Sequence, residues 1–228
     1  APVDGLGTEF FQWAGTRYRG VIGLDHWTLS KTPEDNARML WDLLDPRLRS
    51  GRRLDIITHS RGGLVARAFV ELLGHAEAVR RVVFVGTPNA GTNLANPNNW
   101  GQTADMLINF VHADPMGVYG KLSGFLMNLF ARDAIGDIPG LQAQNPTATG
   151  DQQFLGQLQK SGPPTGVLYS AVAANYEPVS VDFDLKSLSK TAFDVAADSF
   201  YGGPNDLVVD TASVWAVDRA KDLKRPGR

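Results

Sequence analysis

The stretch that most constrains this chain is LDIITHSRGGLVAR, residues 54–67. It begins with a short run of mainly apolar residues, which is typical of a buried strand. A polar segment, THSR at 58–61, follows, and two glycines then lead into an apolar run with helical spacing. A strand that turns so tightly into a helix places the intervening Ser60 at the carboxyl end of the strand. Open α/β sheets bind their ligands at that edge.

The segments around this stretch alternate between strand and helix patterns. We predict strands over 19–26, 53–58 and 79–87, because each is a compact apolar run with β-branched residues. Helices are predicted over 32–46 and from 62 to Gly74, each with an apolar face. This alternation predicts a parallel sheet with right-handed crossovers, and a later run over 167–176 returns to the sheet.

Residues 92–165 break the alternation, because they contain no convincing strand and several amphipathic helical patterns. Apolar residues are dense over 106–111 and 122–130. Two interpretations stay open: these helices pack on the core, or they form a lid whose inner face meets an acyl chain. The organisation predicted is a single α/β domain over 1–228 with a helical insertion at about 92–165.

Charge and cysteine content exclude several classes of function. The net charge is −2, from 22 basic and 24 acidic residues, so no electrostatic footprint for nucleic acid is present. The chain has no cysteine, which excludes disulfides, thiolate metal sites and cysteine nucleophiles. No apolar run approaches the length of a membrane span, and no signal peptide is visible. Together these features slightly favour a cytoplasmic location.

Ser60 is the candidate nucleophile. A tight strand-to-helix turn holds a serine Oγ clear of the backbone and brings N–H groups near the developing oxyanion, which is the physical content of the G-x-S-x-G elbow. The N–H of Arg61 is then the first oxyanion donor. Thr58 replaces the first glycine of the pattern, a departure that crowds the turn from behind. The competing interpretation makes Ser60 a simple N-cap of the helix.

The stretch DIITHSRGGLVAR, followed by VVFVGTPNAGTNLA, resembles the α/β-hydrolase superfamily in its lipase and esterase branch. It is similar to the GPI-inositol-deacylase-like lipases and their bacterial relatives. The resemblance implies an α/β-hydrolase fold, a mostly parallel sheet flanked by helices with a lid insertion, and chemistry without a cofactor or metal. The segment from Gly86 to Gly91 matches a family motif that shapes the floor of the site.

The acid of the site should follow the serine in the chain, because the order in this fold is serine, acid, histidine. The turn GGPNDLVVD is similar to a turn of bacterial lipases whose aspartate orients the histidine, which assigns that role to Asp206. Asp210 and Glu177 are the alternatives. A purely structural interpretation makes Asn205 and Asp206 an Asx turn.

None of the four histidines follows Asp206. His59 adjoins the nucleophile and is expected to support the turn, and His26 ends a predicted strand at the same edge. Both are therefore expected to line the site without acting as the base. For His26, which precedes the turn in the sequence, a structural hydrogen-bonding role is the alternative. His75 is expected to cap a helix, and His112 to lie on the surface of the lid.

Spacing indicates that two parts of the site lie outside the chain. A strand–crossover–strand unit takes roughly 30 residues or more, which puts the base beyond Arg228. The same count, taken backwards from Ser60, puts the loop that supplies the second oxyanion donor at or before residue 1. Gly5 and Gly7 are then a remnant of that loop. We therefore expect the domain to be incomplete at both ends.

The sequence thus predicts a serine ester hydrolase that acts through an acyl-enzyme on a neutral small-molecule or lipid ester. No nucleic-acid partner is expected. Transient contact with a lipid surface through the lid is expected. Two alternatives remain: a degenerate hydrolase fold that serves as a binding or scaffold module, and an amidase or acyltransferase on the same triad. The sequence says nothing of the oligomeric state.

Overall fold

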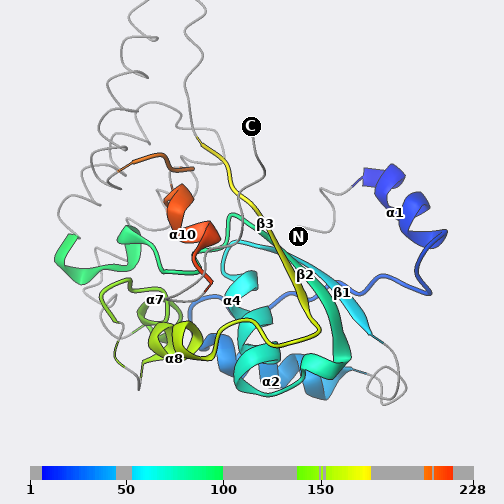
Figure 1. The fold of residues 1–228 in the computed structure, drawn as a ribbon, viewed down its shortest axis with the longest axis horizontal. Coiled ribbons are helices and arrows are strands. Elements are labelled where there is room, and N and C mark those ends of the chain that lie inside the picture. The colour runs from blue at the N-terminus through cyan, green and yellow to red at the C-terminus, as the bar shows by residue number, and fades with distance from the viewer. Residues whose placement is uncertain are drawn as a thin grey trace, which may run out of the picture.

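The computed structural model shows the fold in Figure 1. The residues that it describes are 7–44, 53–99, 138–148, 150, 153–175, 203–206 and 208–217.

A three-stranded parallel sheet lies at the centre, with the strands in the order β1-β2-β3. Strand β1 is Leu54–His59, β2 is Val79–Val85 and β3 is Leu168–Val172. Both pairings are parallel, as the alternation of strands and helices predicts. The carboxyl ends of all three strands therefore meet at one edge of the sheet.

The helical elements are short. The α-helices are α1 (Gly7–Gly15), α2 (Pro33–Leu43), α4 (Gly62–Arg67), α7 (Pro139–Gln142), α8 (Phe154–Ser161) and α10 (Thr211–Trp215). The remaining turns are the π-helix η2 (Ala68–Leu72) and the 3₁₀ turns η3 (Ala76–Ala78), η4 (Asn93–Ala95) and η5 (Pro97–Asn99).

Helix α2 starts where its sequence predicts. The Thr32 hydroxyl accepts from the Asp35 N–H at 3.1 Å, and the Asp35 carboxylate accepts from the Thr32 N–H at 3.1 Å. This reciprocal pair is a capping box, and Pro33 fills the first helical position. Asn36, 1% exposed, then turns inward from α2 toward the segment that precedes it.

Helix α4 continues without a break into η2, so the residues after the serine form one rod. Gly74 ends it with a φ of +75°, a left-handed conformation that favours glycine. Val65, Phe69 and Val70 from this rod are at most 2% exposed. They pack with Val82 and Phe84 of the sheet to form the main core.

The sheet is buried on one face by α2, α4 and η2 (Figure 1). On the opposite face, Ile57 of β1 is 55% exposed, and Leu168 and Val172 of β3 are 66% and 53% exposed. The alternation of inward and outward side chains along β1 and β3 follows from the period of two of a strand.

The strand predicted over 19–26 is wrong, because these residues carry no strand assignment. Val21 and Ile22 remain 45% and 60% exposed. Where this segment reaches Trp27, side chains rather than a neighbouring strand take up the backbone groups. Asn36 accepts from the Trp27 N–H at 3.2 Å and donates to the Trp27 carbonyl at 2.8 Å.

The insertion is described only in part, since the helices predicted over 100–137 lie outside the described residues. Helix α8 packs on the core, because its Leu155 and Leu158 bury against Leu64 of α4. That packing agrees with the first interpretation for this end of the insertion. Among the described helices, none is long and apolar enough to cross a membrane.

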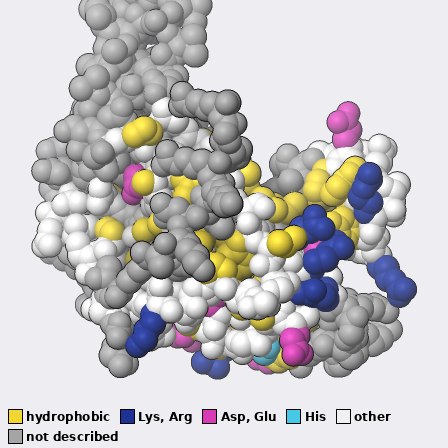
Figure 2. Space-filling view, in the orientation of Figure 1, with side chains coloured by type: hydrophobic (Ala, Val, Ile, Leu, Met, Phe, Trp, Pro, Cys, Tyr) yellow, Lys and Arg dark blue, Asp and Glu magenta, His cyan; other side chains and the backbone are white. Residues whose placement is uncertain are grey.

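Helix α1 lies on the β1 side of the molecule, apart from the other helices (Figure 1). Tyr18, just after it, donates to Asp55 of β1 at 2.6 Å. Asp55 also accepts from Arg80 at 2.8 Å, and Figure 2 shows basic side chains gathered on the side where α1 lies. This attachment leaves the carboxyl edge of the sheet clear of α1.

Candidate active site

Ser60 lies at the turn between β1 and α4, with a φ of +51°. It is the one residue other than glycine with a positive φ in the described part of the chain. Its N–H donates to the Val85 carbonyl at 2.8 Å, and its carbonyl accepts from the Gly63 N–H at 3.0 Å. The backbone is thus fixed on both sides of a left-handed serine, which is the strand-to-helix geometry of a nucleophile elbow.

The N-cap interpretation of Ser60 is not supported. The N-cap residue of α4 is Arg61, and no side chain caps the helix. The Ser60 hydroxyl has no hydrogen-bond partner among the described residues.

Thr58 fits behind the elbow even though it replaces a glycine. A Cβ built on Gly62 would lie 3.8 Å from the Cβ of Thr58, an ordinary van der Waals separation. The Thr58 hydroxyl donates to the Val83 carbonyl at 3.1 Å, so its polar group is satisfied. The lost first glycine therefore does not distort the turn.

Arg61 contributes a free backbone N–H at the start of α4. Its carbonyl accepts from the N–H groups of Leu64 and Val65 at 3.0 and 3.3 Å, as the first helical turn requires. Its own N–H has no acceptor within the described ranges. A donor beside the serine at a helix N-terminus is suited to a developing oxyanion.

The Arg61 side chain turns away from the serine and is 3% exposed. Its guanidinium donates to the carbonyls of Trp27 at 3.2 Å and Lys31 at 2.5 Å. Burial lowers the pKa of Arg61 to about 10, so it stays charged at neutral pH. Through these two hydrogen bonds the Arg61 side chain holds the segment before α2 against the turn at Ser60.

His26 lies beside this guanidinium, with Nδ1 3.5 Å from Arg61 Nη1. A Cβ on Gly62 would lie 3.7 Å from His26 Nε2, so the ring borders the elbow. Burial lowers the pKa of His26, and the charge of Arg61 lowers it further. A guanidinium only donates, so Arg61 can hydrogen-bond to Nδ1 only when that nitrogen carries no hydrogen.

Asp206 reaches the same edge of the sheet from the chain after β3. Gly86, which follows β2 with a φ of +55°, has its Cβ position 3.1 Å from Asp206 Oδ2. Asp206 Oδ1 accepts from the N–H groups of Val208 and Val209 at 3.0 and 2.7 Å. One carboxylate oxygen thus holds a turn, while the other faces the strand end next to Ser60.

Asp206 thus forms the Asx-type turn of the structural interpretation, and its second oxygen lies at the end of β2. Asp210 is occupied differently, since its carboxylate caps α10 by accepting from the Ser213 N–H at 2.6 Å. Burial raises the pKa of Asp210. Glu177, the other alternative, lies outside the described residues, as do His112 and Gly5.

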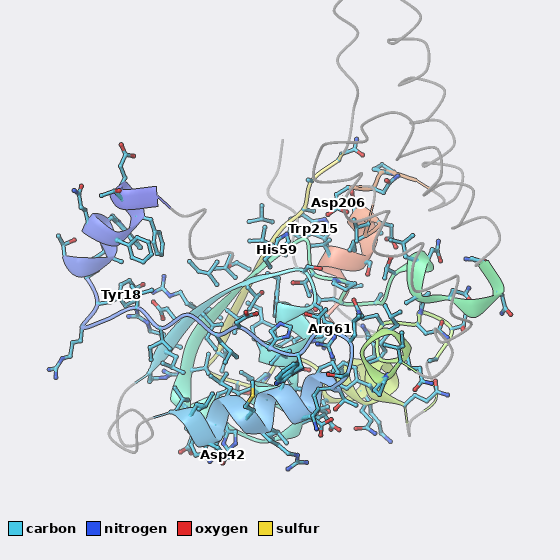
Figure 3. All side chains as sticks on the ribbon, turned by 180° about the vertical axis from the view of Figure 1, so that it is seen from behind. Tyr18, Asp42, His59, Arg61, Asp206 and Trp215 are labelled. Atoms are coloured by element: carbon cyan, nitrogen blue, oxygen red, sulfur yellow. The ribbon has the colours of Figure 1, made fainter. Side chains whose placement is uncertain are left out.

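His59, Arg61, Asp206 and Trp215 gather at one end of the sheet (Figure 3). His59 is the last residue of β1 and is exposed. Neither His59 nor His26 has a hydrogen bond to Ser60 or Asp206 in the described part of the chain. His75 stacks on Trp41 with ring centroids 3.8 Å apart, on the far side of η2 from the serine's turn. Gly7 begins α1 and so belongs to the β1 side of the fold.

No local sequence pattern indicates the buried polar contacts between the loop after β2 and α10. Asn89 and Ser213 are 0% and 3% exposed, and they join the loop after β2 to α10. The motif around Asn89 was visible in the sequence, but its partner is more than a hundred residues away. No cluster of three or more potential metal ligands occurs among the described residues.

The model of a family described as a domain of unknown function (DUF7379) matches residues 3–227. No curated protein matches the sequence. Among solved structures, the chain is similar to a crystal structure of Bacillus licheniformis lipase BlEst2 in mature form, at 18% sequence identity and a TM-score of 0.47. That match covers 83% of this chain and 65% of that chain, so this chain spans less than two thirds of the lipase.

Proposed function

Because this chain belongs to the DUF7379 family, whose function is unknown, we propose its function from the geometry of the site. We propose a serine ester hydrolase with an α/β-hydrolase fold, related to the lipase and esterase branch. The observation that carries the proposal is the left-handed Ser60 at the turn from β1 to α4. A strained non-glycine residue at a sheet edge is characteristic of functional sites.

The chemistry proceeds in two halves. Ser60 Oγ forms a bond to the ester carbonyl carbon while its proton passes to a general base. The Arg61 N–H donates to the oxyanion, and the alcohol leaves with the proton from the base. Water then attacks the acyl-enzyme, its proton passes to the base, and the acid is released as Ser60 regains its proton.

Asp206 is proposed to orient the general base and to stabilise its protonated form. Its Oδ2 supports this role, because it faces the strand end rather than the turn that Oδ1 holds. We assign neither His26 nor His59 as the base. A general base must take up a proton, and burial together with the charge of Arg61 disfavours the protonated form of His26 by lowering its pKa.

A neutral ester is the proposed substrate class. The charge closest in sequence to the nucleophile is the Arg61 guanidinium, and it is buried against backbone carbonyls. It is therefore not directed to bind an anionic group of a substrate. A lid contributed by the insertion, with apolar contacts to a lipid acyl chain, is part of the same proposal.

The test is covalent labelling of the full chain with a fluorophosphonate probe, together with hydrolysis of a short p-nitrophenyl ester. The wild-type chain should label, and Ser60→Ala should abolish both labelling and hydrolysis. Asp206→Asn should lower kcat by about 10³- to 10⁴-fold, the effect of removing a triad aspartate's charge.

Two matched variants serve as controls. Ser170→Ala removes an exposed serine of β3 and should label like the wild type. Asp210→Asn keeps the N-cap of α10 and should retain activity. Equal labelling of the Ser60→Ala variant, or an Asp210→Asn variant that is as impaired as Asp206→Asn, would contradict the assignment.

A further inference from the structure

The segment that carries Asp206 is bound along its length by the loop after β2, residues 86–92. Asn89 Nδ2 donates to the Val214 carbonyl at 2.9 Å. Ser213 Oγ donates to the Gly91 carbonyl at 2.6 Å and accepts from the Ala90 N–H at 3.0 Å. The Thr92 hydroxyl donates to the Val208 carbonyl, so four hydrogen bonds in all join the two segments.

These contacts are shielded from water. Asn89 is 0% exposed, Ser213 3% and Thr92 6%. Hydrogen bonds in such a site are stronger than at the surface, and an unpaired partner left behind is costly. The contact between the two segments is therefore fixed rather than one of several exchangeable arrangements.

The bonds flank the turn that presents Asp206. Thr92 holds the carbonyl of Val208, two residues after Asp206, and Ser213 holds the start of α10. Between these points Asp206 closes its own turn, with its N–H donating to the Val209 carbonyl at 3.0 Å. The loop begins at Gly86, the residue whose Cβ position lies next to Asp206 Oδ2. A shift of the loop against α10 would thus move the carboxylate relative to the elbow.

We propose that Asn89 and Ser213 are positioning residues for the acid of the site. They hold the Asp206 turn in register with the end of β2, so that Oδ2 faces the space beside Ser60. They touch neither the substrate nor the reacting atoms. The catalytic consequence rests on the proposed function, because Asp206 matters only if Ser60 is a nucleophile.

Ser213→Thr and Ser213→Val form the matched pair for the test. Both add the same bulk at a buried position, but only threonine keeps the hydroxyl that makes two of the bonds. Two readouts are taken on the full chain: kcat and KM for the p-nitrophenyl ester, and amide hydrogen exchange in a peptide spanning 203–217. Val70→Ala is the control, because it opens a cavity in the core at a residue 1% exposed and remote from these bonds.

Relative to Ser213→Thr, Ser213→Val should lower kcat by about 10- to 100-fold with KM nearly unchanged, as expected from a misplaced catalytic group. Exchange in the 203–217 peptide should rise by about tenfold or more, because valine loses both hydrogen bonds of the Ser213 hydroxyl. Val70→Ala should lower the melting temperature while kcat and this exchange rate stay near the wild-type values.

Equal kcat and equal exchange in the threonine and valine variants would overturn the positioning role. A wild-type chain whose Ser60 neither labels nor supports hydrolysis would overturn the proposed function and the catalytic part of this inference together, whereas the exchange result would still report on the contact. If neither larger side chain folds, Ser213→Ala, which adds no atoms, replaces the pair, and exchange and kcat like the wild type would reject the proposal.

Discussion

Ser60 is held in a backbone conformation that costs free energy. A left-handed conformation costs a residue with a Cβ about 1–2 kcal/mol. The bonds from Ser60 N–H to Val85 and from Gly63 N–H to Ser60 tie that conformation to the sheet on one side and to the helix on the other. The turn is therefore tight because the surrounding structure determines it, and its effect is to separate the serine side chain from the strand.

The His26 ring lies beside the Arg61 guanidinium beneath this turn. The imidazole is half-buried next to a cation, so its neutral form is favoured. Burial, followed by the charge of Arg61, lowers the pKa of His26 below its usual value of 6.5. The folded chain thus keeps a neutral ring at pH values where the unfolded chain binds a proton.

This pKa shift predicts a pH-dependent stability. As the pH falls through 6.5, the unfolded chain takes up the His26 proton first, so the free energy of unfolding should decrease. The decrease should stop once the pH is below the lowered pKa of the folded state. Urea unfolding between pH 5 and 8 should show a shallower pH dependence for His26→Gln than for the wild type.

Thr28→Val is the control for this measurement. It removes a hydroxyl that donates to the His26 carbonyl at 3.4 Å but leaves the imidazole and Arg61 in place. Its pH dependence should follow that of the wild type. The same slope in the His26→Gln variant would show that this ring does not link protonation to folding.

At the scale of elements, the approach of α4 to the loop after β2 depends on Gly63 rather than Gly62. A Cβ on Gly63 would lie 2.2 Å from Thr87 Oγ1 and 2.8 Å from Thr87 Cβ. Thr87 is 0% exposed, so it has no room to move away. A Cβ on Gly62 meets nothing closer than 3.7 Å. Two adjacent glycines thus have different roles.

Gly63→Ala should therefore destabilise the fold by about 1–3 kcal/mol or more through overpacking. Gly62→Ala should be neutral or should stabilise by up to about 1 kcal/mol, because alanine is the better helix former. Urea unfolding of the two variants gives the comparison directly.

The double variant Gly63→Ala/Thr87→Ala provides the check on the cause. It removes the nearest atoms of Thr87 and should recover part of the lost stability, although the Cβ of residue 87 stays close. Equal stability of the two single variants would mean that the helix adjusts to the added methyl group.

The same elements show how far the sequence predicts the structure. Strands β1, β2 and β3, the capped α2 and the elbow follow from local periodicity and turn residues, which the sequence displays directly. The strand predicted over 19–26 fails because an apolar run does not specify a pairing partner. The carbonyl of the next residue, Trp27, accepts instead from the side chains of Asn36 and Arg61. The link from Asn89 to Val214 spans 125 residues, a contact that no local pattern encodes.

At the scale of the whole molecule, Arg67 connects four parts of the chain. Its buried guanidinium pairs with Glu71 at 2.8 Å and donates to the carbonyls of Asn89, Leu158 and Val217. These acceptors belong to η2, the loop after β2, α8 and the segment just after α10. One charged side chain in the core thus joins the elbow helix to the segments that bear and support Asp206.

Breaking this pair should therefore affect the entire fold. Arg67→Met removes one partner of a buried ion pair, and such a loss costs about 3–5 kcal/mol. Tyr169, whose hydroxyl donates to Glu71 at 2.9 Å, is buried on the same carboxylate, so the change reaches β3 as well. Thermal and urea unfolding of the full chain should show the loss in a single cooperative transition.

The double variant Arg67→Met/Glu71→Leu separates the cost of breaking the ion pair from the cost of losing the hydrogen bonds that Arg67 donates to backbone carbonyls. If the loss of the buried ion pair is the main cost, the double variant should be more stable than Arg67→Met alone, because neither charge of that pair remains. Arg80→Met is the comparison at the surface: its guanidinium pairs with Asp55 and is 48% exposed, so the loss should be much smaller. A double variant no more stable than Arg67→Met would instead assign the cost to the lost carbonyl contacts that join α8 and α10 to α4.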